Sequence, residues 1–271
     1  MSDFPPPPPP PGSIPPPPDM TPPPPYGGQG APLGYGMPAR SFSRIGGISK
    51  VLGGLFATMI VFQALSVIGV VQAANRAQRF LDGRIDEDAF ETASGIELLS
   101  SVTTLLTVGL MVLTIIWMFR IAKNLRAMGR TGLSWAPGWA IGGWFLPPCI
   151  FVIPWLVLQE LWKASDPDVA PADPSWKQRP VTPLLHVWWV LYGLLPIVGA
   201  AVGLSAAWDV LRTAIENGFD EANAATVTAQ SLVDGRVGNV VGGLAQVAAA
   251  AIFMVIVRQL AERHMRCTGE A

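Results

Sequence analysis

Charged and hydrophobic residues are strictly segregated along this chain. None of its 18 basic and 19 acidic residues falls within five long apolar stretches, residues 51–75, 98–119, 131–159, 180–208 and 237–257. Each stretch reaches the ~20 residues that a helix needs to cross ~30 Å of hydrocarbon. One charged side chain at the centre of a spanning helix costs roughly 2.5 to 3.5 kcal/mol, so a bilayer explains the exclusion of charge. The pattern predicts an all-α integral membrane protein with segments at about 51–73, 98–119, 135–158, 184–208 and 237–257.

Composition supports this class and excludes others. Hydrophobic residues make up 50% of the chain and charged residues 14%, as in a helical membrane domain, here placed at residues 45–266. A net charge of -1 argues against nucleic acid as a partner. The two cysteines, Cys149 and Cys267, and the two histidines form no recognisable metal, nucleophile or acid–base arrangement. We therefore expect no cofactor and no enzymatic activity.

Residues 1–43 form a separate, proline-rich part of the sequence. Most of the 27 prolines lie there, in runs at 5–11, 15–18 and 22–25. Such a segment cannot build a hydrophobic core, so we expect a disordered tail with stretches of polyproline II. It acts either as a plain solvated tether or as a docking peptide for a soluble protein.

Basic residues near the segment ends predict the orientation in the membrane. Arg44 and Lys50 precede the first segment, and four basic residues without an acidic one follow the second, whereas residues 82–97 are acidic. Because basic loops stay inside, the N-terminus should be cytoplasmic and the acidic loop outside.

The third segment decides the topology of the remaining chain. If residues 131–159 span, basic residues divide equally between the two sides. If the segment enters and returns on one side, the cytoplasmic side keeps a large excess. Its tryptophans and prolines, which prefer the interface and interrupt helices, also favour a return. The sequence predicts four spanning helices as two hairpins plus a Trp/Pro-rich segment that is re-entrant, with a kinked fifth span as the alternative.

Smaller signals concern helix packing. Gly199, Gly238 and Gly242 belong to pairs of glycines four residues apart, which let neighbouring helices approach closely. Pro196 should kink the fourth helix.

One stretch resembles a known family. The residues are Trp117 to Arg120, Asn124 to Ala127, Trp135 to Ala140, Gly143 to Pro147 and Glu160 to Ser165. They are similar to the signature of the bacterial membrane family catalogued as domain of unknown function 4328. The resemblance implies a proline-rich tail joined to a multi-helix domain in the bacterial cytoplasmic membrane, and no particular chemistry. Where that signature carries an Asn after the Trp-Phe-x-Pro core, this chain has Pro148, Cys149 and Ile150.

The candidate functional residues come from this signature. We expect Asn124 and Arg126 to lie in a basic loop, and Glu160 to pair with Lys163 or to cap a backbone segment. The full set is Arg120, Asn124, Arg126, Gly129, Pro137, Trp139, Trp144, Pro147, Pro154, Glu160 and Trp162.

The favoured function is a structural or scaffolding module in the lipid bilayer, whose cytoplasmic tail tethers a protein partner. The alternative is a small-solute transporter or channel gated by the Trp/Pro segment, with Gln63 and Gln246 among its few polar side chains. The sequence leaves the oligomeric state open.

Overall fold

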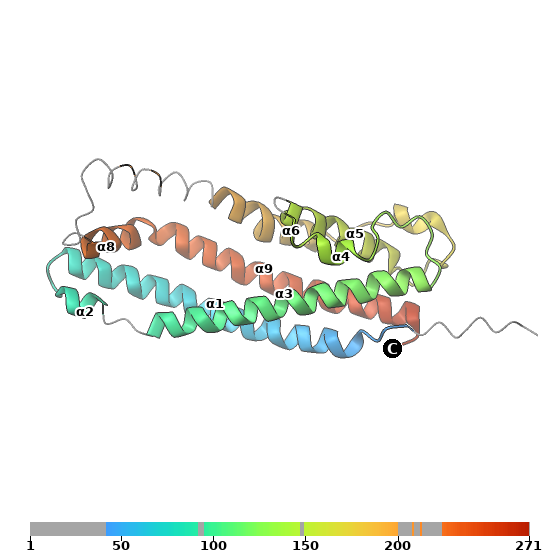
Figure 1. Ribbon diagram of the computed structural model, residues 1–271, viewed down its shortest axis with the longest axis horizontal. Coiled ribbons are helices and arrows are strands. Elements are labelled where there is room, and N and C mark those ends of the chain that lie inside the picture. Colours follow the sequence, from blue (N-terminus) through green and yellow to red (C-terminus); the bar gives the residue numbers. More distant parts are fainter. Residues whose placement is uncertain are drawn as a thin grey trace, which may run out of the picture. The chain divides into compact units, whose positions relative to one another are not determined.

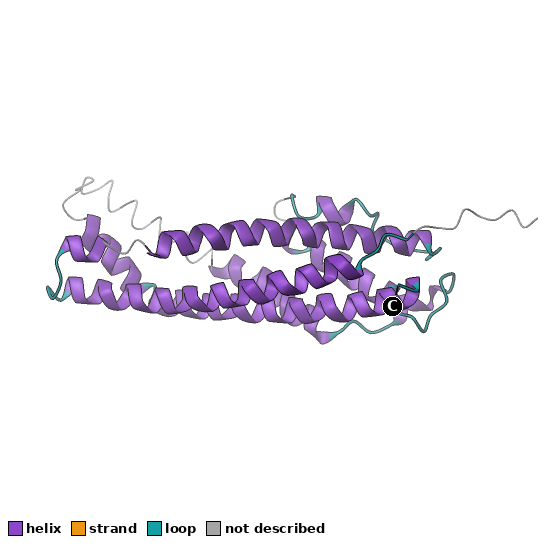
Figure 2. Ribbon diagram, turned by 90° about the horizontal axis from the view of Figure 1, so that it is seen from below, coloured by secondary structure: helices purple, strands orange, loops and turns teal. Residues whose placement is uncertain are grey.

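The computed structural model describes residues 42–91, 95–146, 149–199, 208, 212 and 224–270, all of which belong to one compact unit. Within these residues the chain forms helices and no strands (Figures 1 and 2). The prediction of an all-α chain is thus confirmed. The predicted proline-rich tail lies outside the described residues, apart from Phe42 and Ser43.

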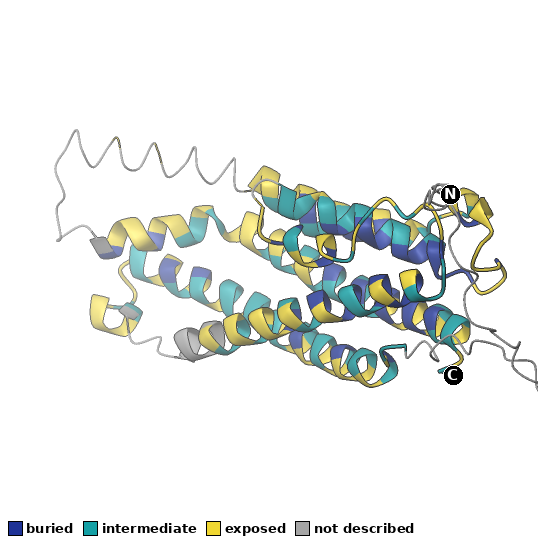
Figure 3. Ribbon diagram, turned by 45° about the vertical axis from the view of Figure 1, so that its right-hand side comes forward, coloured by how far each residue is buried: buried dark blue, intermediate teal, exposed yellow. Residues whose placement is uncertain are grey.

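Among the described residues, three helices are long and apolar enough to cross a membrane. They are α1 (Gly46–Leu81), α3 (Gly95–Ala127, apolar from Ser101) and α9 (Arg236–Thr268). α1 packs along both α9 and α3 (Figure 1). Exposed positions recur along these helices (Figure 3), and large apolar residues such as Leu65, Leu105 and Val241 are among them. A lipid environment would accommodate these faces, which water would not.

The helices extend beyond the predicted segments because hydropathy marks hydrocarbon depth and not helix ends. α1 continues past residue 73 to Leu81 and ends where Gly83 adopts a positive φ of 69°. There the Arg84 N–H donates to the Arg79 carbonyl at 2.9 Å, which closes the helix in the manner of a glycine C-cap. The short helices α2 (Glu87–Glu91) and α8 (Ala224–Asp234) lie at the same end of the unit (Figure 1).

The fourth predicted segment, 184–208, is described as a helix only to Gly199. It begins as α6 (Pro183–Trp189), widens into the π-helix η3 (Val190–Leu194) and continues to Gly199. The π-helix ends two residues before Pro196, whose ring cannot sit in a regular α-helical ladder. A fourth span remains a prediction, because the described part is shorter than a membrane crossing.

The third predicted segment, 135–158, is not one continuous helix. It contains α4 (Trp139–Gly142), the 3₁₀ turn η1 (Cys149–Phe151) and α5 (Ile153–Ala164), and α4 packs against α5. Gly143 permits this contact, since a Cβ there would collide with the Ile153 side chain and lie 3.0 Å from the Trp139 carbonyl oxygen. Pro147 and Pro148, the predicted cause of the break, lie outside the described residues.

The predicted glycine contacts are wrong. A Cβ added to Gly199, Gly238 or Gly242 would meet nothing within 4 Å. The close approach of α1 and α9 occurs one residue further on, where a Cβ on Gly243 would lie 2.5 Å from Val67 Cγ2. Spacing alone does not specify which face of a glycine-rich helix meets its neighbour.

Candidate functional site

The chain preceding α1 is fixed to the ends of α3 and α9. Asn124 lies in the last turns of α3, where its Oδ1 accepts from the Ser43 N–H at 2.8 Å and its Nδ2 donates to the Ser43 carbonyl at 2.9 Å. The Glu270 carboxylate accepts from the backbone N–H groups of Ile45 (2.9 Å) and Gly46 (2.9 Å). A carboxylate at a helix N-terminus satisfies free N–H groups and complements the helix dipole. We call these contacts the N-terminal clamp.

The clamp continues into a buried polar chain. Asn124 Nδ2 also lies 3.2 Å from His264 Nε2, and His264 Nδ1 lies 3.1 Å from Ser165 Oγ. His264 and Ser165 are fully buried, and Asn124 is 2% exposed. Since the amide oxygen faces the Ser43 N–H, the amide nitrogen must donate to Nε2, so His264 is neutral with its hydrogen on Nδ1. Each hydrogen bond in this chain of side chains fixes the orientation of the next side chain.

Arg130 holds the turn that follows α5. Arg130 is 6% exposed, and its guanidinium donates to the carbonyl oxygens of Ala164 (2.8 Å), Asp166 (2.8 Å) and Ala170 (2.6 Å). Three carbonyls converging on one planar fork use a geometry that lysine does not provide. Both ends of the residue 131–164 segment therefore lie at the same end of the helical unit.

Two arginines from different parts of the chain form ion pairs with an acidic residue in this turn. Asp166 Oδ2 lies 3.3 Å from Arg179 Nε and 3.3 Å from an Arg263 guanidinium nitrogen of α9. Arg263 also stacks over the Trp162 ring at 5.0 Å from its centroid. The next turn, η2 (Pro174–Gln178), starts at Asp173, where the Ser175 N–H hydrogen bond lowers the carboxyl pKa.

Glu160 joins the start of the third segment to its end. Its carboxylate accepts from the backbone N–H groups of Ser134 (2.6 Å) and Trp135 (3.1 Å), while Arg126 donates to the Trp135 carbonyl at 3.2 Å. The predicted backbone-capping role of Glu160 is confirmed. The predicted loop position of Asn124 and Arg126 is wrong: both lie within α3, and Asn124 is a buried member of the network.

Most of the remaining predicted residues lie at helix starts, in turns or in the core, where they support the fold. Arg120 donates to the Arg44 carbonyl at 3.1 Å, which adds to the N-terminal clamp. Gly129 adopts a φ of 86°, which allows the turn after α3. Pro137 precedes α4, Trp139 begins it, Pro154 lies in the first turn of α5, and Trp144 and Trp162 are buried. Pro147 lies outside the described residues.

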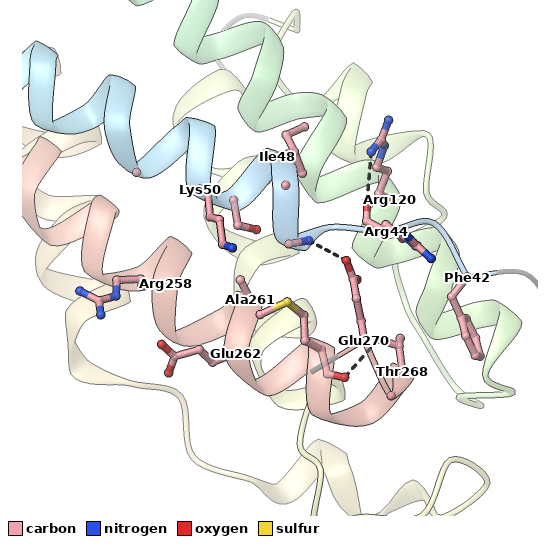
Figure 4. Close-up of a pocket in the computed structure, with 16 residues that line it drawn as sticks. Phe42, Arg44, Ile48, Lys50, Arg120, Arg258, Ala261, Glu262, Thr268 and Glu270 are labelled. Atoms are coloured by element: carbon pink, nitrogen blue, oxygen red, sulfur yellow. Dashed lines mark hydrogen bonds between the residues drawn. The ribbon is translucent and has the colours of Figure 1, made fainter.

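An open groove of about 1340 Å³ lies beside the clamp, where α1 begins and α9 ends (Figure 4). Basic side chains outnumber acidic ones along it, so the groove is electropositive. These side chains are Arg44, Lys50, Arg120, Arg258, Glu262 and Glu270.

Most residues that form these hydrogen bonds and ion pairs were not predicted from the sequence. Asp166, His264 and Glu270 belong to no motif, and Ser165 is only the last residue of the family signature, because each acts through a partner that is distant in sequence; His264 and Asn124 are 140 residues apart. Among the described residues, no three His, Cys, Asp or Glu side chains could together hold a metal ion. The network can position backbone segments at one end of the unit.

Comparison with known proteins gave one family. A family model described as Domain of unknown function (DUF4328) matches residues 81–262, which includes α2 to α8 and most of α9. Nearly all of α1, with the proline-rich segment and Glu270, lies outside the matched range. No curated protein and no solved structure matches the chain.

Proposed function

This chain belongs to the family described as Domain of unknown function (DUF4328), and we propose that it is a multi-pass membrane scaffold whose proline-rich N-terminal segment tethers a soluble partner. Tethering requires no reactive group, so we propose no enzymatic activity and no cofactor. The polyproline runs would supply a stiff, extended ligand with a low entropic cost of docking.

The N-terminal clamp carries this proposal. Asn124 and Glu270 bind the backbone of Ser43, Ile45 and Gly46, directly after the proline-rich segment. A segment that starts from a fixed point confines its partner to a defined volume beside the membrane. Tethering raises the local concentration of a partner, to about the millimolar range where a linker is short and flexible.

The proposed topology has four spanning helices and a re-entrant third segment. Three long apolar helices support it, together with the contacts of Arg130 and Glu160 that bring both ends of the third segment together. In this topology the clamp, the groove and the N-terminal segment face the cytoplasm. The electropositive groove would lie next to the anionic headgroups of that leaflet.

Recovery of partners from the membrane tests the tether. The full-length chain is compared with a variant in which Pro5 to Pro11 and Pro15 to Pro18 are replaced by alanine, so that length is retained. We expect a defined soluble protein to be crosslinked to the wild-type chain in intact cells and to fall at least about tenfold with the variant, because a lost docking site of a few kcal/mol has at least this effect. Equal recovery with both chains, or recovery of no soluble protein, would contradict the tether.

A further inference from the structure

The groove beside the N-terminal clamp is lined by basic side chains from three helices (Figure 4). Lys50 comes from α1, Arg120 from α3 and Arg258 from α9, and Arg44 adds a positive charge from the chain that precedes α1. These residues are distant in sequence, so the fold brings their charges to one place.

Most of this positive charge is not neutralised within the structure. In the described part of the chain, the side chains of Arg44, Lys50 and Arg258 form no ion pair and no hydrogen bond. The carboxylate of Glu270 binds the backbone at the start of α1, and Glu262 is the other acidic residue of the lining. Four basic side chains against two acidic ones leave the groove with an excess of positive charge. An anion in the groove would meet charged donors that have no other partner.

Three of the basic residues lie where an apolar stretch begins or ends. Lys50 is the last charged residue before the apolar part of α1, and Arg120 and Arg258 are the first charged residues after those of α3 and α9. If these helices span a bilayer, all three charges lie at the edge of the hydrocarbon, next to the phosphates of the lipid head groups. A lipid phosphate is already held at this depth, whereas a soluble anion reaches the groove only from the water side.

The groove also has room for a head group and an apolar surface beside it. Gly47 and Gly53 of α1 line it, and a Cβ added to either would meet nothing within 4 Å. Val51, the first residue of the apolar part of α1, is exposed, and so is Val255, which lies one turn before Arg258 on the same face of α9. A lipid could therefore place its phosphate among the basic side chains and its acyl chains along aliphatic ones.

We infer that this groove binds one anionic phospholipid through its phosphate group. Lys50 and Arg258 make the main contacts because their side chains are exposed and have no other partner, while Arg44 and Arg120 add attraction. A zwitterionic lipid carries an ammonium group beyond its phosphate, which the same basic residues repel, so the site selects lipids without that group, such as phosphatidylglycerol. The inference rests on the proposal that the three long helices span the membrane, and does not depend on the tether.

Binding of radiolabelled dioleoyl phosphatidylglycerol to the full-length chain in detergent tests the site by scintillation proximity. Unlabelled phosphatidylglycerol and phosphatidylcholine with the same acyl chains compete for it, so only the head group differs. We expect a single saturable site and an affinity for phosphatidylcholine that is lower by about tenfold or more, because each basic side chain close to the phosphate contributes roughly fivefold.

Two double variants locate the binding. Lys50→Gln with Arg258→Gln removes the proposed contacts and should weaken phosphatidylglycerol binding by about tenfold or more. Lys123→Gln with Arg266→Gln is the matched control, because it removes the same charge from residues that do not line the groove, and its effect should stay below about threefold. All four side chains are exposed, and among the described residues none forms an ion pair or a hydrogen bond, so neither variant removes an interaction of the fold.

Three results would overturn the inference. These are equal affinities for the two lipids, equal losses in the two double variants, or displacement of phosphatidylglycerol by inorganic phosphate well beyond that caused by chloride at the same ionic strength. The last result would make the groove a site for soluble phosphate. Failure of the tether would instead appear in the recovery of soluble partners and would leave these lipid affinities unchanged.

Discussion

The side-chain amide of Asn124 joins three parts of the chain that are distant in sequence. It binds both backbone groups of Ser43, 81 residues away, and donates to His264, 140 residues away. A buried amide whose two N–H groups and carbonyl oxygen all have partners is difficult to replace, because each partner loses its hydrogen bond in a place that water does not reach.

Replacing Asn124 should therefore destabilise the fold more than its size suggests. Asn124→Ala leaves the Ser43 backbone groups and His264 Nε2 without these partners, and we expect a loss of about 2–4 kcal/mol in the free energy of unfolding. Thermal unfolding in detergent measures this change. Lys123→Ala, on the exposed neighbouring position, is the control and should stay within about 0.5 kcal/mol. Similar effects of the two variants would contradict the network.

Arg130 provides a second prediction at this scale. Arg130→Lys keeps the charge but loses the planar fork that binds three carbonyls, so residues 164–170 should exchange their amide hydrogens at least about tenfold faster, which corresponds to about 1.4 kcal/mol. Hydrogen exchange followed by mass spectrometry measures this rate. Arg126→Lys, which removes one exposed hydrogen bond to Trp135, should leave exchange in that turn unchanged. An unchanged exchange rate for residues 164–170 in Arg130→Lys would show that the guanidinium of Arg130 does not hold this turn.

At the scale of elements, the sequence predicts helices better than it predicts their ends and contacts. Exclusion of charge located α1, α3 and α9, because burial in hydrocarbon acts on every residue of a span. It did not predict that α3 continues through Asn124, since helix ends depend on local backbone bonding. Of the predicted site residues, Arg120, Asn124, Arg126 and Glu160 make the hydrogen bonds described above. Ser165, His264 and Glu270 were not predicted, because their roles depend on contacts between distant segments.

The contact between α4 and α5 is testable with adjacent glycines. A Cβ on Gly143 would collide with Ile153, whereas a Cβ on Gly142 would meet open space. Gly143→Ala should destabilise the fold by about 1–3 kcal/mol through overpacking. Gly142→Ala should be neutral or slightly stabilising, because alanine favours the helix. Thermal unfolding distinguishes the two, and an equal response would mean that α4 and α5 do not pack this closely.

At the scale of the whole molecule, the described residues place two loops at opposite ends of the helical unit. α2 lies at one end, and the turn after α5 lies at the other, beside the C-terminal end of α9 (Figure 1). If the unit spans a bilayer, the turn that follows α5 shares its side with the clamp. The transporter alternative remains a prediction.

Labelling of single cysteines tests this topology most directly. In a chain with Cys149 and Cys267 replaced by alanine, one cysteine is placed at Ala172, an exposed position in the turn after α5, and in a second chain at Ala89 of α2, also exposed. Intact cells are treated with a membrane-impermeant maleimide before and after lysis. We expect Ala89→Cys to react in intact cells and Ala172→Cys to react only after lysis, which places the clamp and the proline-rich segment in the cytoplasm. Labelling of Ala172→Cys in intact cells would mean that the third segment crosses the membrane, and would contradict the re-entrant topology.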